Sequence, residues 1–241
     1  YFADAPAGVG FSDLDLNNIP HHISCIMDGN GRWAKKRGLP RSAGHKAGAE
    51  VFRTISKACG RIGIPYVTFY AFSTENWKRS PEEVDALMRL FKDYLLEAQA
   101  DISQAGNIRL KFIGSREGIS DELLQLMDQG ERDTAANTGT TVYVAINYGG
   151  RQEIVQAVNR ALQSGKREIT MDDISANVYT VPDCDLVIRP SGEQRLSNFL
   201  LWQAAYSEFW YSDVLWPDFK TTDLDAAIDN FNNRNRRFGG V

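Results

Sequence analysis

Residues 24–34, SCIMDGNGRWA, run from an apolar, strand-like sequence straight into a glycine-rich turn. The glycines on either side of Asn30 permit positive φ angles and let main-chain N–H groups approach an anion, and the residues after them can begin a helix. Asp-Gly and Asn-Gly are also common turn dipeptides, so a plain connecting turn is the alternative. Positive charge close behind the turn favours an anion site, and it comes from Arg32, Lys35, Lys36, Arg37, Arg41 and His45.

The composition indicates one large globular domain. The chain has 241 residues, of which 43% are hydrophobic and 24% are charged, so it can bury a substantial core. We expect a flexible N-terminal segment over residues 1–18 and one domain over residues 19–241. The formal net charge of -4 argues against a general nucleic-acid binder. The basic residues after the glycine turn therefore indicate a local site for a small anion.

The three cysteines indicate a reducing compartment. Cys25, Cys59 and Cys184 are odd in number and show no CxxC spacing, which predicts reduced, buried thiols in a cytoplasmic protein. No apolar run reaches the roughly 18 residues that span a bilayer, and no secretory signal pattern precedes the first expected strand. These features predict a soluble protein.

Strand-like and helix-like segments alternate along the chain, which predicts an α/β fold. Such apolar runs suit strands that are buried on both faces of a mostly parallel central sheet flanked by helices. Ligands of such sheets bind at the carboxyl ends of the strands, so the functional turns should follow strands. The expected strands are residues 22–27, 66–72, 108–113, 141–147 and 184–188.

A long amphipathic helix is predicted to begin at Pro81, with Ser80 as its N-cap and Glu83 at the capping-box position. Apolar residues then recur at three- and four-residue spacing as far as Ile102, and the helix should end near Gly106. Its roughly 22 residues would extend on the order of 33 Å. Its apolar face either packs on the sheet, as most such faces do, or lines an elongated hydrophobic channel.

Two more turns after expected strands contain groups suited to anions. Residues 72–79 place hydroxyl, amide and guanidinium groups after the second strand, and residues 189–199 place two arginines around a glycine after the fifth. Arginine forks match phosphate oxygens, although Arg189 and Arg195 can equally form surface ion pairs with nearby carboxylates. Glu208 lies among aromatic residues, where an unpaired carboxylate is costly to bury, so it should have a metal or arginine partner.

Taken together, these motifs resemble the cis-prenyltransferase family, the isoprenyl transferases or undecaprenyl diphosphate synthases. The matching segments are residues 27–34, 72–79, 189–202 and 234–240. The resemblance implies sequential condensation of isopentenyl diphosphate with an allylic diphosphate such as farnesyl diphosphate, each new double bond having the cis geometry. It also implies a Mg²⁺ cofactor, an elongated hydrophobic tunnel, and an undecaprenyl diphosphate product that serves as a cell-wall lipid carrier.

The resemblance also implies which residues act in the reaction. It makes Asp28 the principal catalytic residue and, with Glu208, a ligand of Mg²⁺. Ser73 and Asn76 are further candidate catalytic residues, since they match a loop that orients the substrate and closes over the site. The residues implied in binding isopentenyl diphosphate are Arg189, Arg195 and Ser197, with Glu193 organising their turn. The residues implied in binding the allylic substrate, or in the loops around it, are Gly29, Asn30, Gly31, Arg32, Trp33, Arg41, His45, Phe72, Trp77 and Arg79.

The C-terminal segment resembles the family's terminal segment, in which an Arg-x-Gly element reaches the substrate site of the neighbouring subunit. Arg237 and Gly239 occupy these positions. The resemblance therefore implies a homodimer, whereas a solvated basic helix end would need no partner. Transient contact with a membrane surface during product release is also expected.

Other functions must be weighed against this one. A noncatalytic partner subunit of the same fold would be expected to lack Asp28 or the arginine set, and this chain has both. A nucleotide-binding α/β enzyme is disfavoured because the glycine turn lacks both the P-loop ending and the three-glycine dinucleotide fingerprint. A short- or medium-chain cis-prenyl diphosphate synthase stays open, because the sequence does not give the length of the product.

Overall fold

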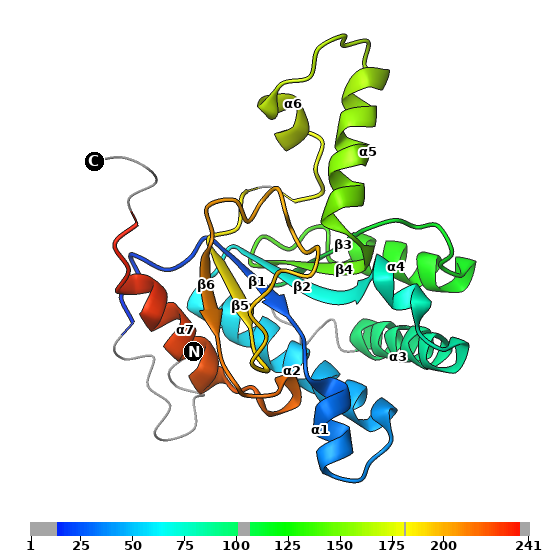
Figure 1. Cartoon of the computed structure of the whole chain (residues 1–241), viewed down its shortest axis with the longest axis vertical. Helices are drawn as coiled ribbons and strands as arrows, with labels where there is room; N and C mark the ends of the chain where they lie inside the picture. The colour runs from blue at the N-terminus through cyan, green and yellow to red at the C-terminus, as the bar shows by residue number, and fades with distance from the viewer. Residues whose placement is uncertain (1–13, 101–106, 181, 237–241) are drawn as a thin grey trace.

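The chain folds around a six-stranded sheet in which every strand pair is parallel (Figure 1). The structure is a computed structural model that describes residues 14–100, 107–180 and 182–236. The strand order is β3-β4-β2-β1-β5-β6, which confirms the predicted α/β class. The strands are β1 (His22–Ile26), β2 (Tyr66–Ser73), β3 (Arg109–Ile113), β4 (Thr141–Tyr148), β5 (Leu186–Arg189) and β6 (Glu208–Tyr211).

Helices connect β1 to β2, β2 to β3, β3 to β4 and β4 to β5, as is usual between parallel strands, whereas residues 190–207 between β5 and β6 include no helix. Each of the five predicted strands is present to within two residues at either end. The helical segments are α1 (Asn30–Lys36), α2 (Arg41–Ile62), η2 (Thr74–Lys78), α3 (Pro81–Ala100), α4 (Asp121–Asp133), α5 (Gly150–Gln163), α6 (Met171–Ser175), η3 (Trp216–Asp218) and α7 (Thr221–Asn232).

β1 lies between β2 and β5 and thereby determines where the functional turns meet. Cys25 is opposite Phe69 of β2 and also opposite Ile188 of β5. Because the three strands are parallel, their carboxyl ends lie at one edge of the sheet. The turns that follow them, which contain the predicted anion-binding groups, are therefore neighbours in space although they are far apart in sequence.

Two hydrophobic clusters lie on opposite faces of the sheet. Ile23 and Cys25 of β1 belong to the larger cluster, which also contains side chains of α2, α3, α4 and α7. Ile26 belongs to the smaller one, which includes Phe199 and Leu200 of the segment after β5. This division follows from the alternation of side chains along a strand. All three cysteines are buried and free, as predicted.

α3 begins where the sequence predicts, at Pro81. The main-chain N–H of Glu83 donates to Ser80 Oγ at 3.3 Å, so Ser80 is the N-cap. The side chain of Glu83 does not complete a capping box, because it pairs with two arginines of the site instead. The helix is assigned as far as Ala100, and its predicted end at residues 102–106 lies outside the described residues.

The predicted flexible segment, residues 1–18, is described only from residue 14, and there it packs against the body. Leu14 contacts the larger hydrophobic cluster. Asn18 Nδ2 donates to the carbonyl oxygen of Asn232 at 3.2 Å, and Arg236 Nη2 donates to Asn18 Oδ1 at 2.9 Å. Residues 14–18 therefore contact the end of α7, and the flexibility of residues 1–18 stays a prediction.

The sequence analysis did not predict β6. Among the described residues, β6 pairs only with β5 and forms one edge of the sheet.

α5 and α6 extend away from the sheet at the top of Figure 1. Within the described ranges, none of the helices combines the length and the apolar character needed to cross a membrane.

His22 should make the stability of the fold depend on pH. Its ring is fully buried, with Nε2 2.8 Å from Thr68 Oγ1 and Nδ1 3.1 Å from the carbonyl oxygen of Pro182. Burial, only partly opposed by the Pro182 contact, lowers the pKa of His22 from 6.5 to about 4. Between these values the unfolded chain binds the proton and the folded chain does not, so stability should fall as the pH is lowered from 7.

For this one group the loss should reach about 2 kcal/mol by pH 5. The measurement is urea unfolding at pH 7 and pH 5 in the wild type and in His22→Gln. The variant should lose less stability over this interval, because glutamine does not titrate. Equal losses in the two proteins would show that His22 does not cause the effect.

Candidate active site

The turns at the carboxyl edge of the sheet surround one cleft of about 1120 Å³. Most of the residues predicted for substrate binding or catalysis line it, although they come from three separate segments of the chain. The predicted residues that line the cleft are Asp28, Gly29, Asn30, Gly31, Arg32, Arg41, His45, Phe72, Ser73, Asn76, Arg79, Arg189, Arg195 and Ser197.

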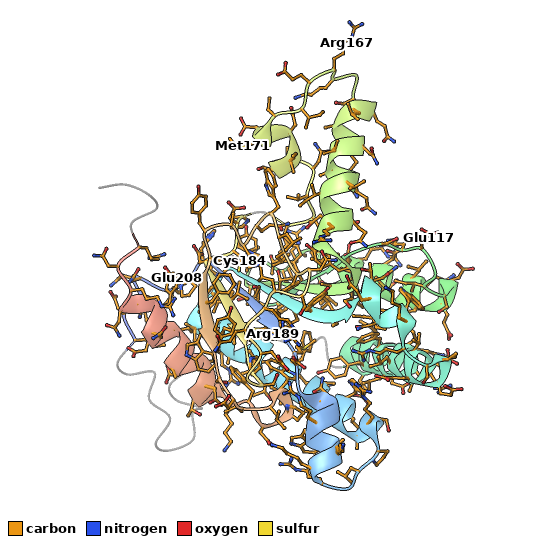
Figure 2. The ribbon with its side chains drawn as sticks, viewed as in Figure 1. Glu117, Arg167, Met171, Cys184, Arg189 and Glu208 are labelled. Atoms are coloured by element: carbon orange, nitrogen blue, oxygen red, sulfur yellow. The ribbon has the colours of Figure 1, made fainter. Side chains whose placement is uncertain are left out.

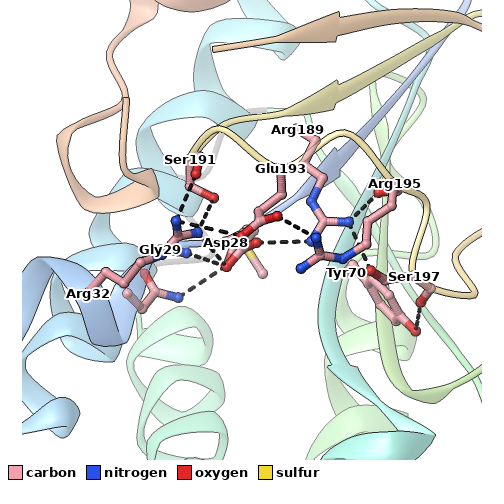
Figure 3. Close-up of polar contacts among 11 residues, drawn as sticks. Asp28, Gly29, Arg32, Tyr70, Arg189, Ser191, Glu193, Arg195 and Ser197 are labelled. Atoms are coloured by element: carbon pink, nitrogen blue, oxygen red, sulfur yellow. Dashed lines mark hydrogen bonds and ion pairs between the residues drawn. The ribbon is translucent and has the colours of Figure 1, made fainter. Parts of the chain in front are cut away.

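Asp28 and Arg189 form the ion pair at the centre of the cleft (Figure 3). Arg189 Nη2 donates to Asp28 Oδ2 at 3.0 Å, and the arginine side chain is only 4% exposed. Its Nη1 donates to Ser197 Oγ at 2.9 Å and to the carbonyl oxygen of Arg195. Burial alone would raise the pKa of Asp28, but Arg189, the N–H of Gly29 and Arg32 together lower it. Asp28 is therefore ionised at neutral pH.

Arg32 joins the first turn to the turn after β5. Its Nη1 donates to the carbonyl oxygen of Ser191 at 2.9 Å and its Nη2 donates to Ser191 Oγ at 2.7 Å. Arg32 Nη1 also lies 3.8 Å from Glu193 Oε1, and Glu193 in turn pairs with Arg195. Glu193 thus pairs with Arg195 of its own turn and with Arg32 of the first turn, although it does not itself line the cleft.

The turn after β5 has an unusual backbone. Ser191, Ser197 and Asn198 have φ angles of 83°, 50° and 64°, which side chains larger than glycine rarely adopt. Strained residues of this kind are concentrated at functional sites, where the surrounding contacts hold them. Here the contacts from Arg32 and Arg189 hold the turn in place.

A second group of basic residues lies across the cleft, between α2 and α3. Glu83 Oε1 is 2.8 Å from Arg79 Nη1, and Glu83 Oε2 is 3.2 Å from Arg41 Nη1. Burial, followed by the charges of Arg79 and Arg41, lowers the pKa of His45 from 6.5 to about 4. His45 is therefore neutral at pH 7, and its buried Nε2 has no partner in the structure. A neutral imidazole with one unused nitrogen suits hydrogen bonding to a bound ligand.

The first turn is packed tightly against α2. Gly29 has a φ of 99°, and a Cβ at this position would lie 2.9 Å from Leu215 Cδ2. A Cβ at Gly44 of α2 would lie only 2.1 Å from the carbonyl oxygen of Asn30. Glycine at these positions thus allows the turn to approach α2 and the segment before η3.

An apolar cavity of about 140 Å³ adjoins the cleft, between the sheet, α2 and α3. Asn30, His45 and Leu87 line both the polar cleft and this cavity. Its remaining walls include Phe52, Phe91 and Tyr94. A cavity of about 150 Å³ holds a single benzene molecule, so this one has room for only a small part of a long hydrocarbon chain. α3 therefore lines an apolar cavity among the described residues, as one of the two sequence alternatives expected, and the elongated tunnel stays a prediction.

Asp28 fits the role of a Mg²⁺ ligand, whereas Glu208 does not. Mg²⁺ is usually held by one or two carboxylates together with phosphate oxygens of the substrate. Asp28 is ionised, 30% exposed and directed into the cleft. Among the described residues, no three or more histidine, cysteine, aspartate and glutamate side chains are grouped so as to hold a metal by themselves. A metal here would therefore depend on Asp28 and on substrate oxygens.

Glu208 lies at the opposite end of the sheet from the cleft (Figure 2). It is the first residue of β6 and is opposite Leu186, whereas Arg189 at the cleft is opposite Tyr211. Its carboxylate pairs with Arg234, so the predicted arginine partner is present. The prediction that Glu208 and Asp28 hold one Mg²⁺ is wrong within a single chain, because the parallel strands separate the two carboxylates by the length of β6.

Two predicted tryptophans lie outside the cleft lining. Trp33 Nε1 donates to Asp218 at 2.7 Å, and its ring stacks with Arg37. Trp77 Nε1 donates to Asn147 Oδ1 at 2.8 Å, on the side of η2 away from the cleft. Both rings have structural partners, so neither is placed to contact a ligand in the cleft. Arg237 and Gly239 lie outside the described residues.

Sequence reasoning missed several residues that line or organise the cleft. Tyr70 lines it, and its hydroxyl donates to the carbonyl oxygens of Tyr148 and Ser197 at 3.2 and 3.3 Å. Ser191 anchors Arg32, and Glu83 holds two arginines. Glu83 occupies a capping position and Tyr70 a strand, so their local sequence signals indicated structure only.

Comparisons with known proteins identify the family of the chain. Residues 26–239 match the prenyltransferase family described as "Putative undecaprenyl diphosphate synthase". An isoprenyl transferase of Clostridium tetani is 51% identical over 240 residues, which cover 95% of this chain and 92% of the relative.

Two solved structures share the fold. A lavandulyl diphosphate synthase from Lavandula x intermedia, solved in complex with dimethylallyl diphosphate, has a TM-score of 0.88 and 33% identity, covering 92% of this chain and 99% of its own. A probable undecaprenyl diphosphate synthase from Campylobacter jejuni has a TM-score of 0.80 and 31% identity, again covering 92% of this chain and 99% of its own. The chain is therefore an enzyme of the undecaprenyl diphosphate synthase family of prenyltransferases.

Proposed function

We propose that this enzyme condenses isopentenyl diphosphate sequentially with an allylic diphosphate, farnesyl diphosphate being the first choice, to give a cis-polyprenyl diphosphate. The observation that carries the proposal is the meeting of three guanidinium-containing turns around one cleft that adjoins an apolar cavity. Two diphosphates need several fixed cations, and the hydrocarbon part of the substrate needs an apolar neighbour.

The residues divide between two anion subsites in this proposal. Arg41, Arg79 and His45, together with the turn at residues 29–32, bind the allylic diphosphate. The turn that contains Arg189, Arg195 and Ser197 binds isopentenyl diphosphate. Arg32 contacts Ser191 of the second turn, which supports placing the two subsites side by side.

The proposed reaction breaks the allylic C–O bond, forms a C–C bond between the two substrates, and releases one proton and diphosphate. Charge grows on the leaving diphosphate, and fixed guanidinium groups stabilise it without reorganisation. Mg²⁺ bound when substrate is present would supply further positive charge at the same oxygens. Asp28 orients Arg189 and would hold the metal, while Ser73 and Asn76 border the cleft. We assign the proton to the released diphosphate.

We propose undecaprenyl diphosphate, a lipid carrier for the cell wall, as the product. The related structures are named for lavandulyl and for undecaprenyl diphosphate synthases, so the shared fold is compatible with products of different length. A cavity of about 140 Å³ must widen to hold a long chain. Product release at a membrane surface and a cytoplasmic location belong to the same proposal.

Incubation of the purified protein with Mg²⁺, farnesyl diphosphate and labelled isopentenyl diphosphate tests the proposal. The expected result is a ladder of extended products, whose longest member gives the chain length. A short product would support the proposed reaction and contradict undecaprenyl diphosphate as the product. Binding of both substrates without extension would instead favour the noncatalytic partner subunit.

We further propose a homodimer that involves the projecting part of the chain. Val155 and Leu162 are seven residues apart on α5 and so lie on one face of the helix, where they are 60% and 46% exposed. Met171 of α6 is 77% exposed. Figure 2 shows it on the projecting part of the chain. Exposed apolar side chains on a projecting part of a protein are typical of protein–protein contacts.

Val155→Glu combined with Leu162→Glu should convert the dimer to monomer. Two charges in an apolar interface must be desolvated without partners, which disfavours association. Light scattering after size exclusion should give twice the chain mass for the wild type and the single chain mass for the variant. Leu96→Glu is the matched control, because Leu96 of α3 is 45% exposed but lies elsewhere. A variant that keeps the dimeric mass would move the interface away from α5.

A further inference from the structure

Asn147 links three segments of the chain at the carboxyl end of β4. Its Nδ2 donates to the carbonyl oxygens of Ser115 and Glu117 at 3.1 and 2.9 Å. Its Oδ1 accepts the indole N–H of Trp77 at 2.8 Å. Its own carbonyl oxygen accepts from Ser115 N at 3.0 Å. Asn147 is only 6% exposed, so all polar groups of its side chain are used inside the protein.

The backbone of Asn147 is set for this contact. Its φ of 50° lies in the left-handed region, where asparagine is tolerated better than most residues. The pairing of β2 with β4 shifts register here: Phe72 is opposite Ile146 and Ser73 is opposite Tyr148, so Asn147 has no partner on β2. An irregularity of this kind re-aims a side chain out of the ladder.

Trp77 in turn fixes η2, which borders the cleft. Its ring packs edge-to-face on Phe72 with centroids 5.1 Å apart. On the other side of η2, Ser73 N donates to Asn76 Oδ1 at 2.9 Å, and both residues line the diphosphate cleft. The indole of Trp77 thus connects η2 to β4 through its hydrogen bond with Asn147, while Ser73 and Asn76 line the cleft.

We infer that Asn147 is a positioning residue for substrate binding: through the indole N–H of Trp77 it holds η2 so that Ser73 and Asn76 face the allylic substrate. Asn147 does not line the cleft itself and acts only through Trp77. The inference rests on the proposed function. It deepens that function by naming a residue of β4 that holds Ser73 and Asn76 in position.

Trp77→Phe is the decisive variant, because phenylalanine keeps an aromatic ring next to Phe72 and removes the indole N–H together with one ring of the indole. Asn147→Gly permits the left-handed backbone and removes the side chain. Each variant should raise KM for farnesyl diphosphate about five-fold, the effect of one lost hydrogen bond, with kcat changed less than about two-fold. The double variant should resemble Asn147→Gly, because both changes break the same contact.

Trp202→Phe is the matched control. Its indole N–H donates to Ser175 Oγ at 3.0 Å, a bond of similar length that joins it to α6 and not to η2 or β4. This variant should leave KM unchanged. Hydrogen exchange at residues 73–79, measured without substrate, should be faster in Trp77→Phe and Asn147→Gly than in Trp202→Phe. A purely structural role would lower the melting temperature without changing KM.

If the wild type extends the allylic substrate, the proposed function stands, and two results would still overturn the inference about Asn147. One is an unchanged KM in Trp77→Phe. The other is an additive rise in KM in the double variant, which would show that Asn147 acts by a route other than the indole. If the wild type does not extend the allylic substrate at all, the proposed function fails, and the assigned role in substrate binding fails with it.

Discussion

Asp28→Ala is expected to lower kcat/KM for chain extension on the order of 10³-fold, the loss typical of removing one preorganised group that stabilises developing charge. Asp28 is the only aspartate or glutamate among the described residues that both lines the cleft and pairs with the buried Arg189. Alanine would leave Arg189 without its carboxylate and remove the proposed metal ligand. Steady-state kinetics with farnesyl and isopentenyl diphosphates provide the measurement.

Asp28→Asn separates the charge from the hydrogen bond. Asparagine keeps an oxygen that can accept a hydrogen bond from Arg189 Nη2. Asp28→Asn should therefore lower the melting temperature less than Asp28→Ala does. Its activity should nevertheless fall nearly as far, because the negative charge is lost. A folded Asp28→Asn protein with near-normal kcat would remove Asp28 from the catalytic role.

Gly44→Ala should produce a large loss of stability from a single methyl group. The new Cβ would lie 2.1 Å from the carbonyl oxygen and 2.8 Å from the carbonyl carbon of Asn30, and backbone cannot move aside as a side chain can. Overpacking of this severity costs about 3 kcal/mol. For a chain of this size, the melting temperature should fall by roughly 6–12 °C. Thermal unfolding followed by circular dichroism measures the change.

Gly60→Ala is the control within the same helix. Its Cβ would meet nothing closer than 3.7 Å, which is ordinary contact. Alanine is a better helix former than glycine by about 0.5–1 kcal/mol, so this variant should melt at a higher temperature than the wild type. If alanine lowers the melting temperature at Gly44 and raises it at Gly60, the loss at Gly44 comes from its close contact with the first turn. Equal, small effects at both positions would contradict the close contact.

The sequence predicted the fold well because five of the six strands are apolar or aromatic runs, and β1 and β5 are buried along their whole length. Continuous apolar runs such as residues 66–72 can be recognised without tertiary information. β6 could not be recognised in this way. Its four residues begin with Glu208, and they are extended because they pair with β5. The position of Glu208 depends on that pairing, which is why its predicted place beside Asp28 was wrong.

The candidate site was predictable to the extent that it follows from strand ends. Parallel strands bring their carboxyl ends together, so turns rich in glycine and arginine could be expected to meet. The directions of Trp33 and Trp77 could not be predicted, since each indole is oriented by a residue from a distant segment, Asp218 or Asn147. A local pattern contains no information about such partners.

The position of β1 between β2 and β5 has a consequence for folding. Ile23 pairs with Val67 and with Leu186, so the centre of the sheet closes loops that include most of the chain. Contacts between such distant residues form slowly, and a nascent or proteolysed fragment that lacks β5 has no Arg189 to pair with Asp28. Recovery of catalytic competence after dilution from denaturant is therefore a late event, and it reports completion of the whole topology rather than of any one segment.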